Sequence, residues 1–222
     1  MKTSLLIALT LLIAVSQAQK PVVQPWANDW YADFTETIEF PLRGHDTTKG
    51  KWWYSWTQKA FRVDRENGNY DRYCGLTKKF QNTPCTQIVT GGTRYLYFPK
   101  DKYCCNCCSA AHGCGITKPT WTATGEFVGS HTDSKGVSYN EWNIQGGMKN
   151  IWGATTDNKA YRLYQEPLSD MLWDVTTYST DAIPSSVFDL PSKDCKHYCP
   201  FFSICTEIRA SAFFRKEQTK AE

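Results

Sequence analysis

The stretch Tyr103-Cys104-Cys105-Asn106-Cys107-Cys108, followed by Cys114, places five of the ten cysteines of this 222-residue chain within eleven residues. Two C-x-x-C spacings, Cys104/Cys107 and Cys105/Cys108, permit a zinc or redox site. Cysteine pairs flanking one Asn suit a single tetrahedral metal site poorly, because their side chains diverge along an extended chain. The other reading is a disulfide cluster, and the compartment in which the protein folds decides between the two.

The sequence of the N-terminus indicates the compartment in which the protein folds. Residues 1–18 are typical of a secretory signal peptide: Lys2 precedes an apolar run from Leu5 to Val15 that is too short to cross a bilayer, and Ser16-Gln17-Ala18 suits cleavage after Ala18. An uncleaved anchor is the alternative. No other apolar run approaches membrane length. We therefore expect a protein that is secreted or held in the lumen of the secretory pathway, where disulfides persist.

An even cysteine count in an oxidising route favours about five disulfides over a metal site. Their connectivity cannot be read from the sequence. The expected half-cystines are Cys74, Cys85, Cys104, Cys105, Cys107, Cys108, Cys114, Cys195, Cys199 and Cys205.

The rest of the chain predicts strands. Phe34, Ile38 and Phe40 alternate with mainly polar residues, as in a half-buried strand. Asn67-Gly68 and Gly91-Gly92 are hairpin signals, and turn residues recur about every ten positions. We expect an antiparallel, all-β fold with little helix, forming a single domain over residues 19–222 with a short C-terminal tail, helical near 208–220.

Aromatic residues make up 14% of the chain, including nine Trp. Residues two apart in a strand share a face, so Trp52, Tyr54 and Trp56 are expected on one side of a sheet. Such a face is either ordinary core or the lining of a ligand cavity. The predicted lining residues are Trp52, Tyr54, Trp56, Tyr95, Tyr97, Trp142, Tyr161 and Trp173. If Tyr95 and Tyr97 point inward, Arg94 and Leu96 point the other way.

Catalytic and nucleic-acid-binding signals are weak. There is no G-x-S-x-G, H-E-x-x-H, phosphate-binding glycine loop or haem C-x-x-C-H motif, and His45, His112, His131 and His197 are expected in solvated loops. A net charge of +3, scattered along the chain, argues against nucleic acid or an anionic membrane as partner. We therefore expect no enzyme, although a carboxylate-pair hydrolase leaves no fixed spacing and stays a third alternative.

We expect no cofactor and no metal site, with calcium as the exception to test. Oxygen ligands for an irregular Ca²⁺ site could come from Asp133, Asp157, Asn158 and Asp174, although no EF-hand loop is present.

Several segments follow an order seen in ependymin-related proteins. The strongest is 183–195, where Pro184-Ser185, Phe188, Pro191 and Cys195 resemble the family's closing P-S-x-F-x-x-P-x-x-C element. The strand 92–97, Cys114-Gly115-Ile116 and Glu141-Trp142 add to a sparse match over about residues 30–205. The cysteine cluster is richer than the family pattern, so the chain resembles a divergent, cysteine-rich branch.

The resemblance implies two stacked antiparallel sheets or a half-barrel with a deep apolar pocket, braced by disulfides and similar to bacterial lipoprotein carriers. Ependymin-like proteins are secreted, often dimeric, and associated with lipid and calcium binding. A hydrophobic ligand, a homodimer and a Cys114–Cys195 disulfide are therefore what the resemblance implies for this chain. The expected function is a secreted, non-enzymatic carrier of a lipid or other hydrophobic ligand. The alternative is an extracellular structural, matrix or cell-surface interaction protein.

Overall fold

The computed structural model describes residues 20–40, 44–69, 71–79, 81–145, 149–166 and 169–211. The expected signal peptide and the chain beyond 211 lie outside these residues. The strands are β1 (Asp29–Phe40), β2 (Gly44–Ser55), β3 (Ala60–Arg65), β4 (Cys85–Thr90), β5 (Thr93–Phe98), β6 (Tyr103–Ser109), β7 (Glu126–Thr132), β8 (Ser138–Ile144), β9 (Asn150–Thr155), β10 (Ala160–Gln165) and β11 (Ser169–Trp173). The helical elements are α1 (Arg72–Gly75), five short 3₁₀ turns, η1 (Pro99–Asp101), η2 (Ala110–His112), η3 (Pro119–Thr122), η4 (Ser185–Phe188) and η5 (Lys193–Lys196), and a segment at 204–211.

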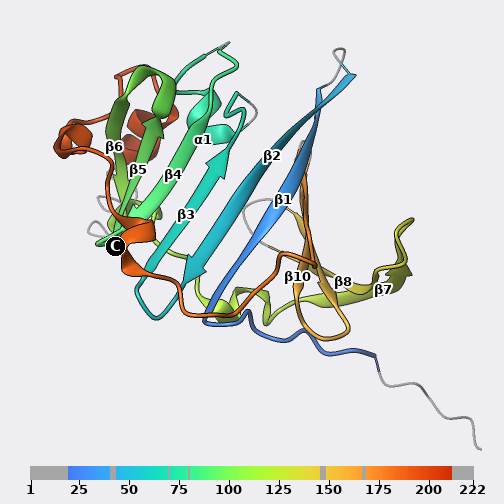
Figure 1. The fold of residues 1–222 in the computed structure, drawn as a ribbon. Helices are drawn as coiled ribbons and strands as arrows, with labels where there is room; N and C mark the ends of the chain where they lie inside the picture. Colours follow the sequence, from blue (N-terminus) through green and yellow to red (C-terminus); the bar gives the residue numbers. More distant parts are fainter. Residues whose placement is uncertain are drawn as a thin grey trace, which may run out of the picture.

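All eleven strands belong to one antiparallel sheet in the order β6-β5-β4-β3-β2-β1-β11-β10-β9-β8-β7. Figure 1 shows that the sheet curls, with β2 to β6 forming one wall and β7, β8 and β10 turning across from them. The all-β, disulfide-braced prediction is confirmed in its half-barrel form. The expected two separate sheets are replaced by one continuous sheet, because β1 is hydrogen-bonded to β2 on one side and β11 on the other.

One glycine allows close packing inside the curl. A Cβ atom on Gly50 would lie 2.1 Å from the carbonyl oxygen of Asp64 and 2.4 Å from Cζ of Phe34. Gly50 is the partner of Phe34 across β2 and β1, so the Phe34 ring lies over the backbone of β2. Glycine is required here by the close approach of the ring.

The concave face carries the main apolar core. Trp30, Trp152 and Trp173 are each no more than 2% exposed and form its centre. Two irregular segments cross this face: the lead-in at 20–27 and the connection at 116–122. They are joined by a hydrogen bond from the Trp26 amide to the Pro119 carbonyl, 3.0 Å from N to O.

The cysteines form five disulfides, as expected: Cys74–Cys85, Cys104–Cys195, Cys105–Cys199, Cys107–Cys205 and Cys108–Cys114. Three of them fasten the C-terminal segment to β6, and in Figure 1 this segment lies beside β5 and β6. The Cys114–Cys195 pairing implied by the resemblance is wrong. Cys114 follows a tight turn that returns it to Cys108, whereas Cys195 lies beside Cys104.

The two glycine hairpin signals have different outcomes. Gly91 and Gly92 both have positive φ, 55° and 72°, and join β4 to β5 directly, as predicted. Asn67-Gly68 does not form a two-residue hairpin. Instead the chain continues from β3 into α1 before β4 returns beside β3. Asp71 N-caps this helix, its Oδ1 accepting from the Cys74 amide at 2.8 Å, and the cap competes successfully with a tight turn.

The predicted C-terminal helix begins earlier than expected, at residue 204, and its described part ends at 211. In the described part of the chain, no helix has the length and apolar character needed to span a membrane.

Candidate functional site

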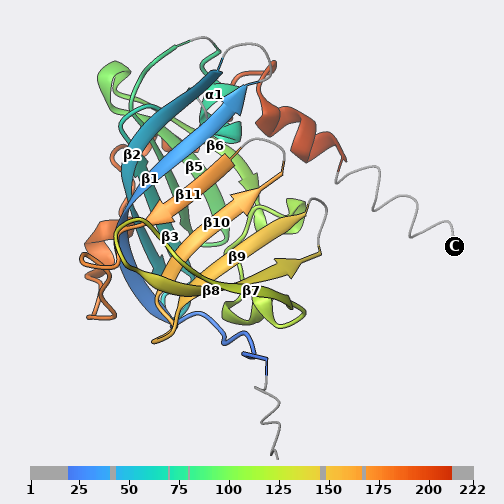
Figure 2. The same ribbon diagram turned by 90° about the vertical axis from the view of Figure 1, so that its right-hand side faces the viewer.

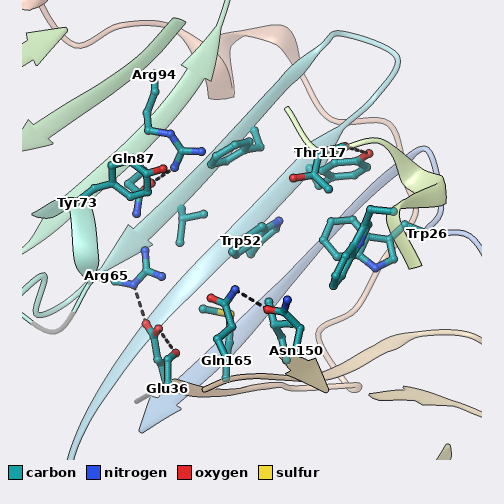
Figure 3. Close-up of a pocket in the computed structure, with 17 residues that line it drawn as sticks. Trp26, Glu36, Trp52, Arg65, Tyr73, Gln87, Arg94, Thr117, Asn150 and Gln165 are labelled. Carbon is teal, nitrogen blue, oxygen red and sulfur yellow. Dashed lines mark hydrogen bonds and ion pairs between the residues drawn. The ribbon is translucent and has the colours of Figure 1, made fainter. Parts of the chain in front are cut away.

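A cavity of about 340 Å³ lies on the concave face of the sheet (Figure 3). Its lining comes from β1 to β5, α1, the 116–122 connection, the lead-in and β9 to β11. The lining residues are Trp26, Glu36, Trp52, Tyr54, Phe61, Val63, Arg65, Tyr73, Gln87, Arg94, Thr117, Trp121, Asn150, Leu163, Gln165, Ser169 and Met171.

One end of the cavity is aromatic. Trp26 from the lead-in meets Tyr54 of β2 and Trp121 of the connection, with ring centroids 5.1 Å and 5.4 Å away. Trp52 of β2 stacks on Phe61 of β3 at 5.8 Å between centroids. Edge-to-face and offset-stacked rings at these distances form a rigid apolar wall.

Tyr54 fastens the connection to this wall. Its hydroxyl donates to the carbonyl oxygen of Thr117, with 2.8 Å between the oxygens. Burial, followed by the negative charge of Asp29, raises the pKa of Tyr54 well above its ordinary value. The hydroxyl therefore stays protonated as a donor at any physiological pH.

The other end is polar and charged. The Arg65 Nε donates to Glu36 Oε2 at 2.7 Å, and Arg65 Nη1 lies 3.4 Å from Asp71 Oδ2. Glu36 Oε1 also accepts from the Ser169 hydroxyl at 2.8 Å. Burial alone lowers the pKa of Arg65, but the carboxylates of Glu36 and Asp71 more than offset this, and the pKa is raised overall.

Arg94 of β5 lies at the same end, with different partners. Its Nη1 donates to Oε1 of Gln87, and its guanidinium carbon lies 4.2 Å from the ring centroid of Tyr73 and 5.0 Å from that of Phe61. Its Nε is shielded from solvent and has no hydrogen-bond partner in the described chain. Burial lowers the pKa of Arg94.

Two of the eight predicted lining residues, Trp52 and Tyr54, line the cavity. Trp56 follows the end of β2 and packs against the aromatic core, with Lys59 Nζ 3.2 Å from its ring centroid. Tyr95 and Tyr97 lie on the opposite face of β5, because the alternation places Arg94 and Leu96 on the concave side. The predicted inward direction of these two tyrosines is therefore reversed.

The last three predicted residues also lie away from the cavity. Trp142 and Trp173 are buried in the core, where the Trp142 Nε1 donates to the Pro21 carbonyl at 3.2 Å. A β-bulge between Ala160 and Arg162 turns Tyr161 to the outer face. There its hydroxyl donates to Asp133 Oδ2, with 2.5 Å between the oxygens.

Sequence reasoning did not identify Arg65, Arg94 or Trp121 as lining residues. No local pattern pointed to Arg65, because its carboxylate partners, Glu36 on β1 and Asp71 at the α1 cap, lie 29 and 6 positions away. Arg94 could have been found from the alternation stated for Tyr95, had the inward face of that strand been known.

Of the four residues expected to supply oxygen ligands for calcium, Asp133, Asp157 and Asp174 accept hydrogen bonds within the protein, and the Nδ2 of Asn158 donates to the Pro25 carbonyl at 3.1 Å. Asp133 accepts from Tyr161 and from the backbone amides of Lys135 and Val137, which lowers its pKa. Asp157 accepts from the Thr155 hydroxyl, and Asp174 from the Thr176 hydroxyl, each at 2.6 Å between oxygens. Over the described ranges, no three His, Cys, Asp or Glu side chains come together as a metal-binding group.

No family model matches the chain, and no curated protein matches it in sequence, so the ependymin-related resemblance stays a prediction. Among solved structures, an uncharacterized conserved protein from Thermus thermophilus matches with 10% identity and a TM-score of 0.48, over 77% of this chain and 90% of its own. A LolA-superfamily protein from Nitrosomonas europaea matches with 8% identity and a TM-score of 0.36, over 74% and 91%. A DUF1329 family protein from Desulfovibrio piger gives 7% identity and a TM-score of 0.35, over 73% and 90%. With every one of these TM-scores below 0.5, the similarities assign this chain to no family.

Proposed function

We propose that this chain is a secreted, non-enzymatic protein that binds a lipid or other hydrophobic ligand in the concave cavity. The observation that carries the proposal is the cavity itself: about 340 Å³ left open beside an aromatic wall that is otherwise closely packed. Small-molecule sites usually measure roughly 300–1,000 Å³ and are mostly apolar with a few polar groups. The cavity falls within that range.

The aromatic end supplies the binding free energy in this proposal. Burying apolar ligand surface against Trp26, Trp52 and Trp121 removes it from water, worth about 25 cal/mol per Å². Rigid rings add little ordering cost, because tryptophan has only two side-chain torsions and these rings already hold one another in place.

The carboxylates near the cavity favour binding over chemistry. Glu36 is held by Arg65 and Ser169, and Asp71 caps α1 while accepting from Gln87 Nε2 at 2.6 Å. Both acids therefore have structural partners, and their shared contact is Arg65. We assign the cavity a holding role on this ground.

The five disulfides support the compartment in the proposal. Such cross-links are typical of proteins that fold in oxidising compartments and are rare in the cytosol. Secretion itself rests on the signal-peptide pattern at residues 1–18. Its test is N-terminal sequencing of protein from a eukaryotic secretory host, with Gln19 expected as the first residue.

Native mass spectrometry of the oxidised protein, with lipid extraction of the same sample, tests the function. We expect adducts of small-molecule mass that are lost in Leu163→Trp, because the indole fills the cavity from β10. Leu172→Trp is the matched control, since Leu172 lies on the neighbouring strand β11 and is 40% exposed. A protein without adducts, which also fails to bind added fatty acids and phospholipids, would contradict the proposal.

An interaction role at the surface is the second candidate, favoured by three exposed aromatic residues near the C-terminal disulfides. Tyr198, Phe201 and Phe202 are 67%, 76% and 82% exposed. Rings this open often contact a partner. Replacing Phe201 and Phe202 by Ser should leave ligand binding intact and would reveal any loss of self-association or surface attachment.

A further inference from the structure

Two arginines reach the cavity, and only one of them has a carboxylate partner. Arg65 is 6% exposed and is paired with Glu36 and Asp71, so its charge is balanced inside the protein. Arg94 forms no ion pair with any carboxylate of the described residues. Its neighbour Asp71 is nearby, but Asp71 Oδ2 is already shared between Arg65 and the amide of Gln87.

The partners of Arg94 hold its position without neutralising its charge. Gln87 accepts from Arg94 through one amide atom and donates to Asp71 through the other, which fixes the amide orientation. The rings of Tyr73 and Phe61 lie close to the guanidinium. Burial and the like charge of Arg65 lower the pKa of Arg94, and the opposing effects of Tyr73 and Asp71 do not make up the difference. A cation that is buried and incompletely balanced favours a nearby anion.

The position of Arg94 within the cavity gives a ligand two different ends. In Figure 3, Arg94, Gln87 and Tyr73 lie together at one side, Trp26 lies at the opposite side, and Trp52 lies between them. A molecule that extends along the cavity therefore meets a guanidinium at one end and indole rings along its body.

We propose that the cavity takes a single-chain amphipath, an aliphatic carboxylic acid, with its carboxylate at Arg94 and its alkyl chain against Trp52 and Trp26. Guanidinium is well suited to this headgroup, because its planar N–H donors match the two oxygens of a carboxylate. At about 340 Å³ the cavity lies near the lower end of the usual roughly 300–1,000 Å³ of small-molecule sites, which favours a medium chain over a long one. This inference rests on the proposed function.

The test compares two ten-carbon probes with different headgroups, decanoate with a carboxylate and 1-decanol with a neutral hydroxyl, by tryptophan fluorescence titration of the full oxidised chain at pH 7. A carboxylic acid is ionised at this pH. We expect the wild-type protein to bind decanoate about 10- to 100-fold more tightly than 1-decanol, the range for a hydrogen bond to a charged group. Arg94→Met should abolish this preference, lowering the affinity for decanoate far more than that for 1-decanol, while Arg94→Lys should retain part of the preference.

Arg62→Met is the matched control, because Arg62 lies on the opposite face of β3 and contacts Asp64 and the Val187 carbonyl. It should leave both affinities unchanged. Equal binding of acid and alcohol by the wild-type protein would overturn the inference and leave the proposed function standing, as would an intact preference in folded Arg94→Met. If neither probe binds, both the inference and the proposed function fail. The wild-type comparison needs no variant, so a variant that does not fold leaves the test in place.

Discussion

Arg62 and Arg65 lie on one strand, β3, and each contacts a carboxylate, yet their surroundings differ. The side chains of Arg65 and Glu36 are each 5% exposed, whereas those of Arg62 and Asp64 are 28% and 33% exposed. Solvent screens the charges of the Arg62–Asp64 pair, whereas the Arg65–Glu36 pair is shielded from solvent. Removing one partner of a buried pair leaves an uncompensated charge, which costs far more than the loss of an exposed pair.

Arg65→Met should therefore lower the free energy of unfolding by about 3–5 kcal/mol, because the Glu36 carboxylate stays buried without its partner. Arg62→Met should cost about 1 kcal/mol or less, the range for exposed pairs. Unfolding in guanidinium chloride, followed by tryptophan fluorescence, measures the free energy of unfolding of both variants. Equal costs for the two variants would contradict the assigned role of burial.

Tyr178 is expected to make stability depend on alkaline pH. Its ring stacks on Trp30 with centroids 5.5 Å apart, and burial, followed by the charge of Asp157, raises its pKa to about 12. An unfolded tyrosine titrates near pH 10, so the folded state disfavours the phenolate. The contribution is fully present below about pH 10 and is lost as the pH rises through about 12.

Tyr178→Phe removes this titration. The wild-type protein should lose stability relative to Tyr178→Phe between pH 10 and about 12, with a constant difference at lower pH. Chemical unfolding at a series of pH values gives the difference directly. A difference that stays constant through pH 12 would show that Tyr178 titrates alike in both states.

At the scale of elements, the C-terminal segment is joined to β6 by three disulfides that run side by side. They connect residues separated by 91, 94 and 98 positions. Each would close a long loop if it were alone. Together they close the same loop, so their effects on the unfolded chain cannot add.

Replacing Cys105 and Cys199 by Ala should therefore cost about 2 kcal/mol, and not the about 4.7 kcal/mol of a single loop of this length. With Cys104–Cys195 intact, the Cys105–Cys199 bond closes only a small ring, because Cys105 is one position from Cys104 and Cys199 is four positions from Cys195. Replacing Cys74 and Cys85, which close an independent loop with a separation of 11, should cost more, about 3 kcal/mol. Guanidinium unfolding without reductant ranks the two variants, and the reverse order would contradict shared closure.

At the scale of the whole molecule, the cavity depends on both walls of the curled sheet. Arg94 comes from β5 and Leu163 from β10, and between them in the sheet lie β4, β3, β2, β1 and β11. Figure 2 shows the wall formed by β1 and β7 to β11 from its outer side. A ligand in the cavity contacts strands of both walls and should therefore favour the curled, folded state over the unfolded one.

Decanoate should accordingly raise the melting temperature. At 100 times the dissociation constant, a ligand that binds only the folded state adds about 2.7 kcal/mol of stability. For a chain of this size the shift is about 5–10 °C. Differential scanning calorimetry measures it, with Leu163→Trp as the control expected to show no shift, and an unchanged melting temperature in the wild-type protein would contradict binding.

Local patterns predicted much of the fold and part of the site. The alternation that places Phe34 and Ile38 on the buried face and the paired glycines at 91–92 were correct, because strand pleat and positive φ depend on a few neighbouring residues. The side chain of Phe40 lies outside the described part of the chain. Trp52 and Tyr54 were placed together for the same reason. Asn67-Gly68 was wrong, because the Asp71 cap and α1 impose a different path on the same stretch.

From composition and short-range pattern alone, the chain dictates an antiparallel β fold, an even number of cysteines that pair as disulfides and an aromatic face on β2, since each depends on residue type or on spacings of a few positions. Folding decides the rest. The direction of Arg94 depends on which face of β5 meets the curl, Tyr161 is turned outward by one bulge, and Cys195 meets Cys104 across 91 positions. These are consequences of strand order and sheet curvature, which arise from packing between segments far apart in sequence and leave no trace in the local pattern.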